Sequence, residues 1–380
     1  MNNEEERRER FLPRVNAGVS ALIFFMINEA PAVVNNTLSH PDNMLEVRDL
    51  KMHFPIRLGI FSQTSGYVKA VDGVSFEIRN GETLGLVGES GCGKSTIGRC
   101  LVRAYDVTDG QMLYQAADGS VVDLAAIEGN ELRALRKDIR MIFQDPYSSL
   151  NPRMTVFENV SEALRVSGVS RSEMKDRVAA LLRRVGLRPE YMTRYPHAFS
   201  GGERQRIVIA RCLITNPRLI VADEAVSALD VSVRAQILNL LKELQEEFQL
   251  TYLFISHDLS VIRHICDRIA VMYVGKLVET ATGDELFRKP THPYTEALLS
   301  AVPINDPNDR GKRDRIRLTG EVADPSNPPT GCYFHPRCSY ADERCVVEDP
   351  PLKHVGNGSS GQVAKCHYAD KLDLRGVING

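Results

Sequence analysis

A glycine-rich segment near residue 90 has the residue types and spacing that bind phosphate. Residues 88–96 read GESGCGKST and match the pattern G-x-x-x-x-G-K-[ST], between a short apolar run and a predicted helix. Glycines let backbone N–H groups surround phosphate oxygens, the lysine reaches the β- and γ-phosphates, and the next hydroxyl ligates Mg²⁺. The candidate nucleotide-binding residues of this segment are Gly88, Ser90, Gly91, Gly93, Lys94, Ser95 and Thr96.

A second segment places two adjacent acids directly after an apolar run. Residues 219–222 predict a buried strand, and Asp223 and Glu224 follow it. An acid at such a strand end holds the Mg²⁺ ion in phosphate-loop NTPases. The neighbouring Glu224 is placed to orient or deprotonate the attacking water. The two segments together predict hydrolysis of a nucleoside triphosphate.

These residues need strands that end at a common edge. Residues 45–80 alternate between apolar and polar types, as strands do. Residues 83–87, 219–222 and 252–255 are short apolar runs that each lead into polar residues. The pattern predicts an α/β fold with a largely parallel sheet and functional side chains at the carboxyl ends of its strands.

Residues from about 148 to 200 predict an inserted helical subdomain. Ser170 and Glu173 have the spacing of a capping box, apolar residues follow at helical intervals, and Gly186 ends the pattern. An amphipathic helix is also expected after Asp230.

The composition changes again near residue 290, where Pro, Gly, Asp and Asn and then four cysteines become frequent. We read this change as the start of a separate C-terminal module. The predicted organisation is a poorly ordered extension over residues 1–43, a nucleotide-binding domain over 44–288 and a C-terminal region over 289–380.

Residues 199–206, with the sequence FSGGERQR, connect these segments to a family. They closely resemble the LSGGQ signature of the ABC ATPases, with Phe for Leu and Glu for Gln. The resemblance implies a P-loop ABC-type nucleotide-binding domain with an antiparallel β lobe and a helical subdomain. It also implies ATP as the nucleotide, and a signature helix whose N-terminus binds the γ-phosphate of ATP held by a partner subunit. The signature residues implied in this contact are Ser200, Gly201 and Gly202.

The remaining motifs of the family follow in order, and the resemblance implies their roles. Gln144 matches the Q-loop residue, which contacts Mg²⁺ or water and relays to the membrane subunits. Asp230 matches the D-loop, and His257 matches the switch histidine that contacts the γ-phosphate. An aromatic residue upstream of the phosphate loop stacks on adenine in this family, and both Phe54 and Tyr67 qualify.

The C-terminal residues resemble a narrower group. Residues 288–298, RKPTHPYTEAL, and residues 331–338, GCYFHPRC, look like the tail of oligopeptide/dipeptide importer ATPases, and more like the second, F-type, ATPase. The resemblance implies a subunit at the cytoplasmic face of the plasma membrane that energises peptide import. The implied partners are a second ATPase subunit, identical or related, two permease subunits and a solute-binding protein. Import of nickel, glutathione or sugar, and a soluble ABC ATPase without transport, are the alternatives.

The cysteines of the C-terminal region are spaced C-x5-C-x6-C-x20-C, as Cys332, Cys338, Cys345 and Cys366. Zinc ribbons contain close pairs such as C-x2-C, so this pattern fits zinc poorly. Four thiolates without close pairs can hold a [4Fe–4S] cluster, which tails in this family are associated with. We therefore expect the cluster in preference to zinc, with reduced, buried thiols as the third alternative. The nearby ligand candidates that could replace a cysteine are His335 and His367.

Charge and hydropathy argue against two further classes, nucleic-acid-binding proteins and proteins that span a membrane. The 380 residues carry a formal net charge of −2, which does not indicate a broad nucleic-acid-binding surface. The most apolar N-terminal stretch, residues 17–27, is shorter than the roughly 20 residues of a membrane-spanning helix. We therefore expect a cytosolic chain that acts at a membrane only through partners.

Overall fold

The computed structural model describes residues 37–58, 63–302, 315–356 and 361–377. The predicted extension lies almost wholly outside these ranges, and so does the apolar stretch at residues 17–27. The described residues from Leu38 onward form one compact unit. Among the residues that the structure describes, no helix combines the length and apolar character needed to cross a membrane.

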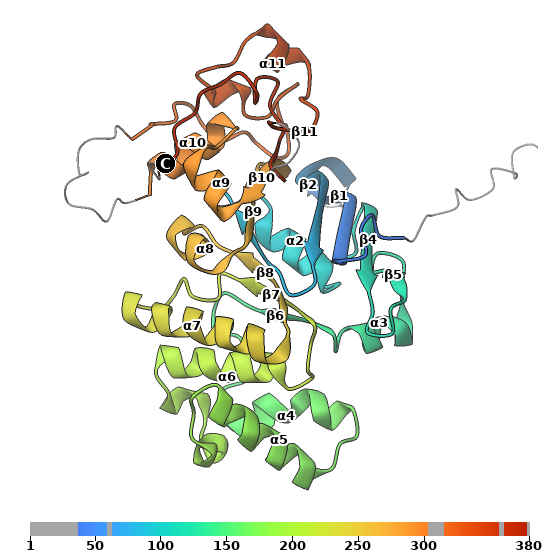
Figure 1. The fold of residues 1–380 in the computed structure, drawn as a ribbon. Coiled ribbons are helices and arrows are strands. Elements are labelled where there is room, and N and C mark those ends of the chain that lie inside the picture. The colour runs from blue at the N-terminus through green and yellow to red at the C-terminus, as the bar shows by residue number, and fades with distance from the viewer. Residues whose placement is uncertain (1–36, 59–62, 303–314, 357–360, 378–380) are drawn as a thin grey trace, which may run out of the picture. The chain divides into compact units, whose positions relative to one another are not determined.

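The central element is an eight-stranded sheet with the order β11-β12-β10-β9-β3-β8-β7-β6 (Figure 1). Strands β3, β6, β7, β8 and β9 run parallel to one another, which confirms the predicted parallel sheet. Strands β10 and β12 extend it in antiparallel fashion. The strands are β3 (Thr83–Val87), β6 (Ile139–Ile142), β7 (Leu219–Asp223), β8 (Thr251–Ile255), β9 (Arg268–Tyr273), β10 (Lys276–Thr282), β11 (Lys353–His354) and β12 (Val363–Ala364).

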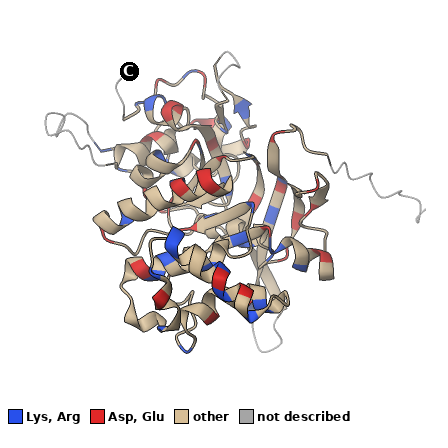
Figure 2. Cartoon of the chain, turned by 60° about the horizontal axis from the view of Figure 1, so that its bottom comes forward, with Lys and Arg blue, Asp and Glu red and all other residues tan. Residues whose placement is uncertain are grey.

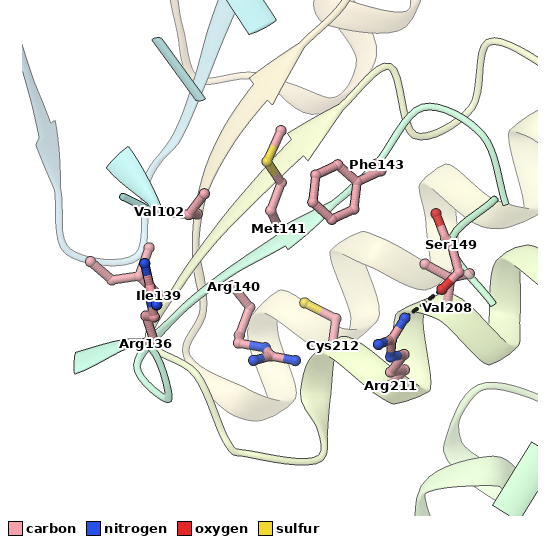
Figure 3. Close-up of a pocket in the computed structure, with 10 residues that line it drawn as sticks. All are labelled: Val102, Arg136, Ile139, Arg140, Met141, Phe143, Ser149, Val208, Arg211 and Cys212. Atoms are coloured by element: carbon pink, nitrogen blue, oxygen red, sulfur yellow. Dashed lines mark hydrogen bonds between the residues drawn. The ribbon is translucent and has the colours of Figure 1, made fainter. Parts of the chain in front are cut away.

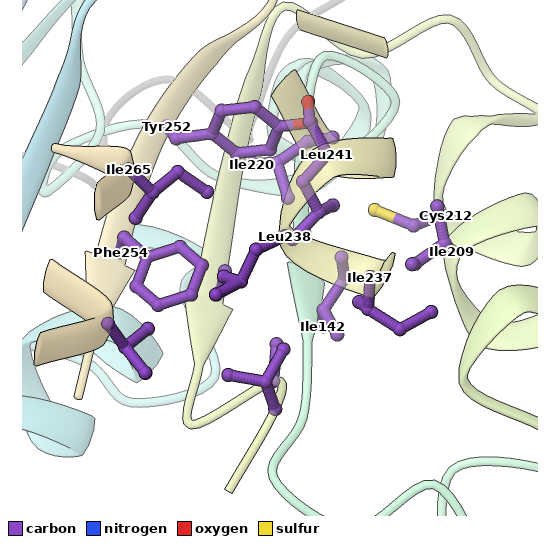
Figure 4. Close-up of a cluster of buried hydrophobic side chains, with 14 of the residues drawn as sticks. Ile142, Ile209, Cys212, Ile220, Ile237, Leu238, Leu241, Tyr252, Phe254 and Ile265 are labelled. Carbon is purple, nitrogen blue, oxygen red and sulfur yellow. The ribbon is translucent and has the colours of Figure 1, made fainter. Parts of the chain in front are cut away.

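The parallel strands are buried on both faces, so successive side chains enter different cores. Along β8, Tyr252 and Phe254 join one cluster, whereas Leu253 and Ile255 join the other. Figure 4 shows the first cluster, in which strand residues meet Ile237 of helix α7. Continuous apolar runs, rather than alternating ones, are therefore the expected sequence of these strands.

The second cluster lies between the central sheet and a smaller antiparallel sheet with the order β2-β1-β4-β5. Helix α2 contributes Ile97 and Cys100 to the same cluster. This small sheet is the predicted antiparallel lobe, and its first two strands cover the region where the sequence alternates. The strands are β1 (Asn43–Leu58), β2 (Gln63–Arg79), β4 (Asp109–Gln115) and β5 (Val121–Asp123).

Helices cover the sheet and form the insertion, and Lys and Arg are interspersed with Asp and Glu over them (Figure 2). The helix predicted after Asp230 is α7, which begins with that residue as its N-cap. The main helices are α2 (Lys94–Leu101), α3 (Gly129–Leu135), α4 (Val156–Val166), α5 (Arg171–Arg184), α6 (Gly201–Leu213), α7 (Val231–Phe248), α8 (Leu259–Ile265), α9 (Gly283–Arg288), α10 (Pro293–Ser300) and α11 (Glu343–Val347).

The capping box expected at the start of α5 is only half formed. Ser170 is the N-cap, and its hydroxyl accepts a hydrogen bond from the backbone N–H of Glu173. The Glu173 carboxylate accepts instead from Arg177, one turn further along the helix. The complete box in this part of the molecule is at α4, between Thr155 and Glu158.

The C-terminal region is built into the same unit, so the expected separate module is not confirmed. Strand β12 pairs with β10, opposite Glu279. The Glu279 carboxylate is buried and accepts hydrogen bonds from the backbone N–H of Thr291 and from the Gln362 amide. Phe334, which is 2% exposed, belongs to the large core cluster that fills one side of the sheet. Aromatic packing and strand addition thus join this region to the nucleotide-binding core.

Candidate functional site

Four parallel strands end at the same edge, and a predicted site residue follows each of them. Gly88 follows β3, Gln144 lies two residues beyond β6, Glu224 follows β7 and His257 lies two residues beyond β8. The ladder β6-β7-β8-β3 brings these strand ends side by side. Residues far apart in the sequence therefore face one site, as expected at the carboxyl edge of a parallel sheet.

The phosphate loop requires glycine where its backbone turns against the β-lobe and β9. Gly88 and Gly93 have φ of 154° and 107°. A Cβ atom on Gly93 would lie 2.0 Å from the carbonyl oxygen of Ala70, and one on Gly88 would lie 2.1 Å from that of Met272. Backbone from two other elements thus fixes the loop that precedes α2, whose N-terminus supplies N–H groups for an anion.

The lysine and the serine of the loop have defined partners. Lys94 is 5% exposed, and its Nζ donates to the carbonyl oxygens of Gly88 and Glu89 at 2.8 and 2.9 Å. Ser95 Oγ donates to Asp223 Oδ1 at 2.8 Å. Burial raises the pKa of the Asp223 carboxyl, although the Ser95 hydrogen bond acts in the opposite direction. Ser95 and Asp223 therefore place a hydroxyl and a carboxylate oxygen side by side, and both are of the kind that could ligate Mg²⁺.

Glu224 is held at both carboxylate oxygens. Gln144 Nε2 donates to Glu224 Oε2 at 2.7 Å, and His257 Nδ1 lies 3.0 Å from Glu224 Oε1. Glu224 has φ of 48°, a conformation that is uncommon for residues other than glycine. Its side chain is 17% exposed, so solvent still reaches it. The arrangement fits a base that acts on water and is oriented by two neighbours.

The signature segment lies at the N-terminus of α6. Ser200 is the N-cap, and its backbone N–H and hydroxyl donate to Glu203 in a full capping box. A Cβ atom on Gly202 would lie 2.5 Å from Val233 Cγ1, at the start of α7. Within the described residues, no hydrogen bond or ion pair joins Ser200, Gly201 or Gly202 to the phosphate loop of the same chain.

One arginine links the backbone of the D-loop, next to Asp230, to the residue that follows the switch histidine. Asp230 caps α7 and accepts from the backbone N–H of Val233 at 3.0 Å. Arg234 donates to the carbonyl oxygen of Leu229 at 3.2 Å and to Asp258 at 2.9 Å. Asp258 directly follows His257, so the D-loop and the histidine are held relative to each other. No motif in the sequence indicates this role for Arg234.

The two adenine-stacking candidates lie on the small sheet. Phe54 on β1 packs edge-on against Tyr105, with ring centroids 5.3 Å apart. Tyr67 on β2 is 51% exposed. The two residues lie on paired strands, where Phe54 is opposite Val68 and Tyr67 is opposite Pro55. They remain two candidates for the same contact.

The four C-terminal cysteines line one cavity, although the described residues form no metal site. All four line one small apolar cavity, together with His335 and His367. Within the described ranges, no group of three or more His, Cys, Asp or Glu side chains is arranged to hold a metal ion. Burial raises the pKa of the Cys332 thiol to about 11 and that of the Cys338 thiol to about 12. The expected iron–sulfur cluster therefore has no support from a formed metal site.

One contact to the phosphate loop was not predicted at all. Arg337, in the C-terminal region, donates to both carboxylate oxygens of Glu89 at 2.8 and 3.1 Å. Tyr294 accepts a hydrogen bond from the backbone N–H of the same glutamate at 2.9 Å. The sequence pattern leaves position 89 unspecified, and the two partners lie 205 and 248 positions away, so no local signal could have indicated these contacts.

The fold and the strand-edge site define an ATPase of the phosphate-loop class with an ABC-type signature helix. Comparison with known proteins agrees. Residues 71–227 match the ABC transporter family, and residues 278–345 match the C-terminal region of oligopeptide/dipeptide transporters.

Curated relatives match over most of the chain. The chain is 51% identical to the oligopeptide transport ATP-binding protein AppF of Bacillus subtilis, over 87% of this chain and 99% of that protein. It is 48% identical to OppF of Salmonella typhimurium, over 89% and 100%, and 47% identical to the dipeptide transport protein DppF of Escherichia coli, over 88% and 96%.

Solved structures share the fold. The protein cbiO1 of Clostridium perfringens, described as part of an ABC transporter complex, matches 65% of this chain and 91% of its own with a TM-score of 0.55 and 26% identity. The cassette MJ0796, described as a dimer bound to ADP and phosphate, matches 63% and 98% with a TM-score of 0.54 and 27% identity. The chain belongs to the ATP-binding subunits of the oligopeptide/dipeptide group of ABC transporters, and it is an ATPase.

Proposed function

We propose that this chain energises the import of peptides by ATP hydrolysis, as one subunit of a membrane-bound importer. The observation that carries the proposal is the arrangement at the strand edge, where Ser95 and Asp223 pair beside a Glu224 held by Gln144 and His257. A complete set of hydrolytic groups distinguishes a working motor from a degenerate partner subunit. The cargo class follows from the relatives, which are named as oligopeptide and dipeptide transport proteins.

The proposed roles follow the geometry. Lys94 and the loop N–H groups bind the phosphates of ATP, while Ser95 and Asp223 ligate Mg²⁺, with Gln144 at its outer shell. Glu224 takes a proton from the attacking water. His257 contacts the γ-phosphate and orients Glu224. Phe54 or Tyr67 stacks on adenine.

Ser200–Gly202 act on a second subunit, identical or related to this one. In this chain, the signature residues have no hydrogen bond to the loop 88–96 among the described residues. Their N–H groups at the start of α6 are suited to an anion that a different chain holds. Asp230 lies on the same side, at the start of the adjacent α7. ATP clamped between two subunits then drives closure, and hydrolysis reopens them.

A surface pocket beside the Q-loop suits the permease partner. Figure 3 shows Phe143 and Met141 of the β6 segment on one side and Arg211 of α6 on another. Phe143 is 45% exposed and directly precedes Gln144, which holds Glu224. A permease segment docked here would be one residue from the catalytic network. Basic groups at the rim suit a segment with acidic or carbonyl groups. The lining residues are Val102, Arg136, Ile139, Arg140, Met141, Phe143, Ser149, Val208, Arg211 and Cys212.

Two measurements test this function. In cells that lack the native chain, the wild type should restore uptake of a labelled tripeptide, and the Glu224→Gln variant should not. If cells that lack the chain take up peptides normally but lose the uptake of nickel, glutathione or sugar, that solute is the cargo instead. Arg140→Glu should reduce co-purification with the permease subunits while ATP binding stays unchanged, and retained co-purification would exclude the pocket as the docking surface.

We also propose a bound group in the cysteine-lined cavity, for which a [4Fe–4S] cluster is the candidate. The four cysteines line it, and His367 lines the same cavity with a buried Nδ1 that has no hydrogen-bond partner. The described residues form no group of three or more side chains arranged around a metal ion, so the preference for a cluster over zinc rests on the cysteine spacing, which lacks the close pairs of zinc ribbons. A cluster would be held by the thiolates and would supply electron-transfer or structural capacity.

Anaerobic purification tests this second proposal. Protein with a cluster should be brown and should lose iron and colour in the Cys338→Ser, Cys345→Ser double variant. Colourless protein without iron or zinc would show that the cysteines are buried thiols. Colourless protein with stoichiometric zinc would show that the site is a zinc site and not a cluster.

A further inference from the structure

The phosphate loop is contacted from the C-terminal region by a clamp of two residues, Tyr294 and Arg337, which lie within the two segments that resemble the importer tail. Glu89 is the second residue of the loop and is contacted at every polar group. Tyr294 accepts from its N–H, Lys94 donates to its carbonyl oxygen, and Arg337 donates twice to its carboxylate. Two of these three partners lie beyond position 289.

The clamp is rigid because its members are packed. The Arg337 side chain is only 7% exposed, and its guanidinium lies 5.8 Å from the centre of the Tyr273 ring. The rings of Tyr273, Tyr294 and Phe334 form a cluster with centroid separations of 4.7 to 5.4 Å. Aromatic clusters of this kind fix the positions of the polar groups that their rings carry. Arg337 and Tyr294 thus approach the loop from a single rigid patch.

The charge of Glu89 explains why the clamp matters. A carboxylate in the loop that wraps the phosphates would repel a bound nucleotide, because like charges at short range disfavour one another. The two parallel hydrogen bonds from Arg337 neutralise that carboxylate and hold it in one orientation. The Glu89 carbonyl, in turn, is one of the two that position Lys94.

We propose that Arg337 and Tyr294 are positioning residues for ATP binding, which act through Glu89 on the phosphate loop. The C-terminal region is thereby a part of the nucleotide site and not only an appendage of it. This role of Arg337 and Tyr294 affects ATP affinity and does not depend on the cargo or on any group bound in the cysteine cavity.

A single and a double variant of the full-length chain test the proposal, with MgATP as the ligand. Arg337→Gln leaves Glu89 unpaired beside the phosphates and should raise the Kd for MgATP by about tenfold, the size expected for a lost charged hydrogen-bond pair. Glu89→Gln together with Arg337→Gln removes both charges and should return the Kd to within about threefold of the wild type. Turnover at saturating MgATP should stay within about twofold in both variants, since neither residue contacts the water-activating group.

Further variants separate positioning from folding. Tyr294→Phe keeps the ring and removes only the acceptor, so the Kd should rise about threefold. Arg337→Lys keeps the charge without the fork and should give an intermediate Kd, which keeps the test usable if Arg337→Gln does not fold. Arg344→Gln breaks an exposed ion pair with Glu348 in the same region and should leave the Kd unchanged. An unchanged Kd in both Arg337 variants, or a double variant as weak as Arg337→Gln alone, would overturn the proposal.

Discussion

The nucleotide site and the cysteine-lined cavity both gather residues that lie far apart in the chain, but they are assembled differently. Gln144, Glu224 and His257 of the nucleotide site each come after a strand of one parallel ladder, so the register of that ladder places the three residues together. The cavity residues lie in turns and short helices, and aromatic packing around Phe334 holds them against the core. The first site depends on regular backbone pairing, and the second depends on side-chain packing.

The two regions nevertheless meet at Glu89. Phosphate-loop backbone lies between them, with β3 and Lys94 on one side and Arg337 and Tyr294 on the other. Damage to strand-edge chemistry should therefore leave the C-terminal packing intact, whereas damage to the packing should reach the nucleotide. The following predictions test that asymmetry.

The largest effect is expected from Glu224→Gln. The amide keeps the shape of the side chain but is not a base, so steady-state ATP turnover should fall by about a hundredfold or more. The Kd for ATP and the melting temperature should change little, because the C-terminal packing is untouched. Glu246→Gln, an exposed change on α7, is the control and should be neutral. Normal turnover in the Glu224→Gln variant would assign the base elsewhere.

A methyl group in the phosphate loop should abolish binding itself. In Gly93→Ala the new Cβ would lie 2.0 Å from the Ala70 carbonyl oxygen, and the backbone has φ of 107°. Equilibrium binding should show loss of ATP affinity of about a hundredfold or more, because the loop must leave its conformation.

Gly119→Ala is the matched control for that change. Gly119 also has a positive φ, of 84°, but no atom lies within 4 Å of the position that its Cβ would take. We expect only a loss of about 1 kcal/mol in the free energy of unfolding, from backbone strain, with ATP affinity unchanged. Equal effects of the two substitutions on ATP binding would show that backbone strain alone, and not the contact with Ala70, causes the loss of ATP affinity.

The nucleotide site and the C-terminal region differ in how much of their structure could be predicted from the sequence. The phosphate loop and the acids after β7 could be predicted because each lies next to an apolar strand, and parallel strands share an edge. The histidine after β8 could be predicted from the resemblance to the ABC ATPases. The half-formed box at Ser170 could not, because Arg177 competes for Glu173. The Arg337–Glu89 contact spans 248 positions and has no periodic pattern, so only the folded chain shows it. The contacts that join the C-terminal region to the core could not be predicted for the same reason.

Truncation of the aromatic cluster should affect both regions. Phe334→Ala removes a ring that contacts Tyr273, Tyr294 and His292, at a cost of about 3–5 kcal/mol in the free energy of unfolding. ATP affinity should fall as well, since Tyr294 and Arg337 lose their support. Val347→Ala, at a side chain that is 78% exposed, should change stability by less than about 0.5 kcal/mol.

The shape of the unfolding curve distinguishes a shared core from a separate C-terminal module. One cooperative transition, shifted as a whole by Phe334→Ala, is expected from a shared core. Two transitions, of which only the lower one moves while ATP binding stays normal, would instead describe a separate C-terminal module and would contradict the integration of the two regions.

The smallest effect separates helix capping from ligand binding. Ser200 and Thr282 are both N-caps of complete capping boxes, with Glu203 and Glu285 as the reciprocal partners. Either residue changed to Ala should lower the free energy of unfolding by about 1 kcal/mol, because the same kind of hydrogen bond is lost. If Ser200 also binds the γ-phosphate held by a partner subunit, Ser200→Ala should reduce ATP turnover of the assembled dimer by about tenfold, while Thr282→Ala should not. Denaturant unfolding and steady-state turnover measure the two quantities on the same samples. Because the Ser200 contact is made in the dimer, binding of ATP to the isolated chain should be equal in both variants. Equal turnover would reduce Ser200 to a helix cap, and a loss of ATP binding to the isolated chain would place Ser200 at its own nucleotide and refute the face-to-face arrangement.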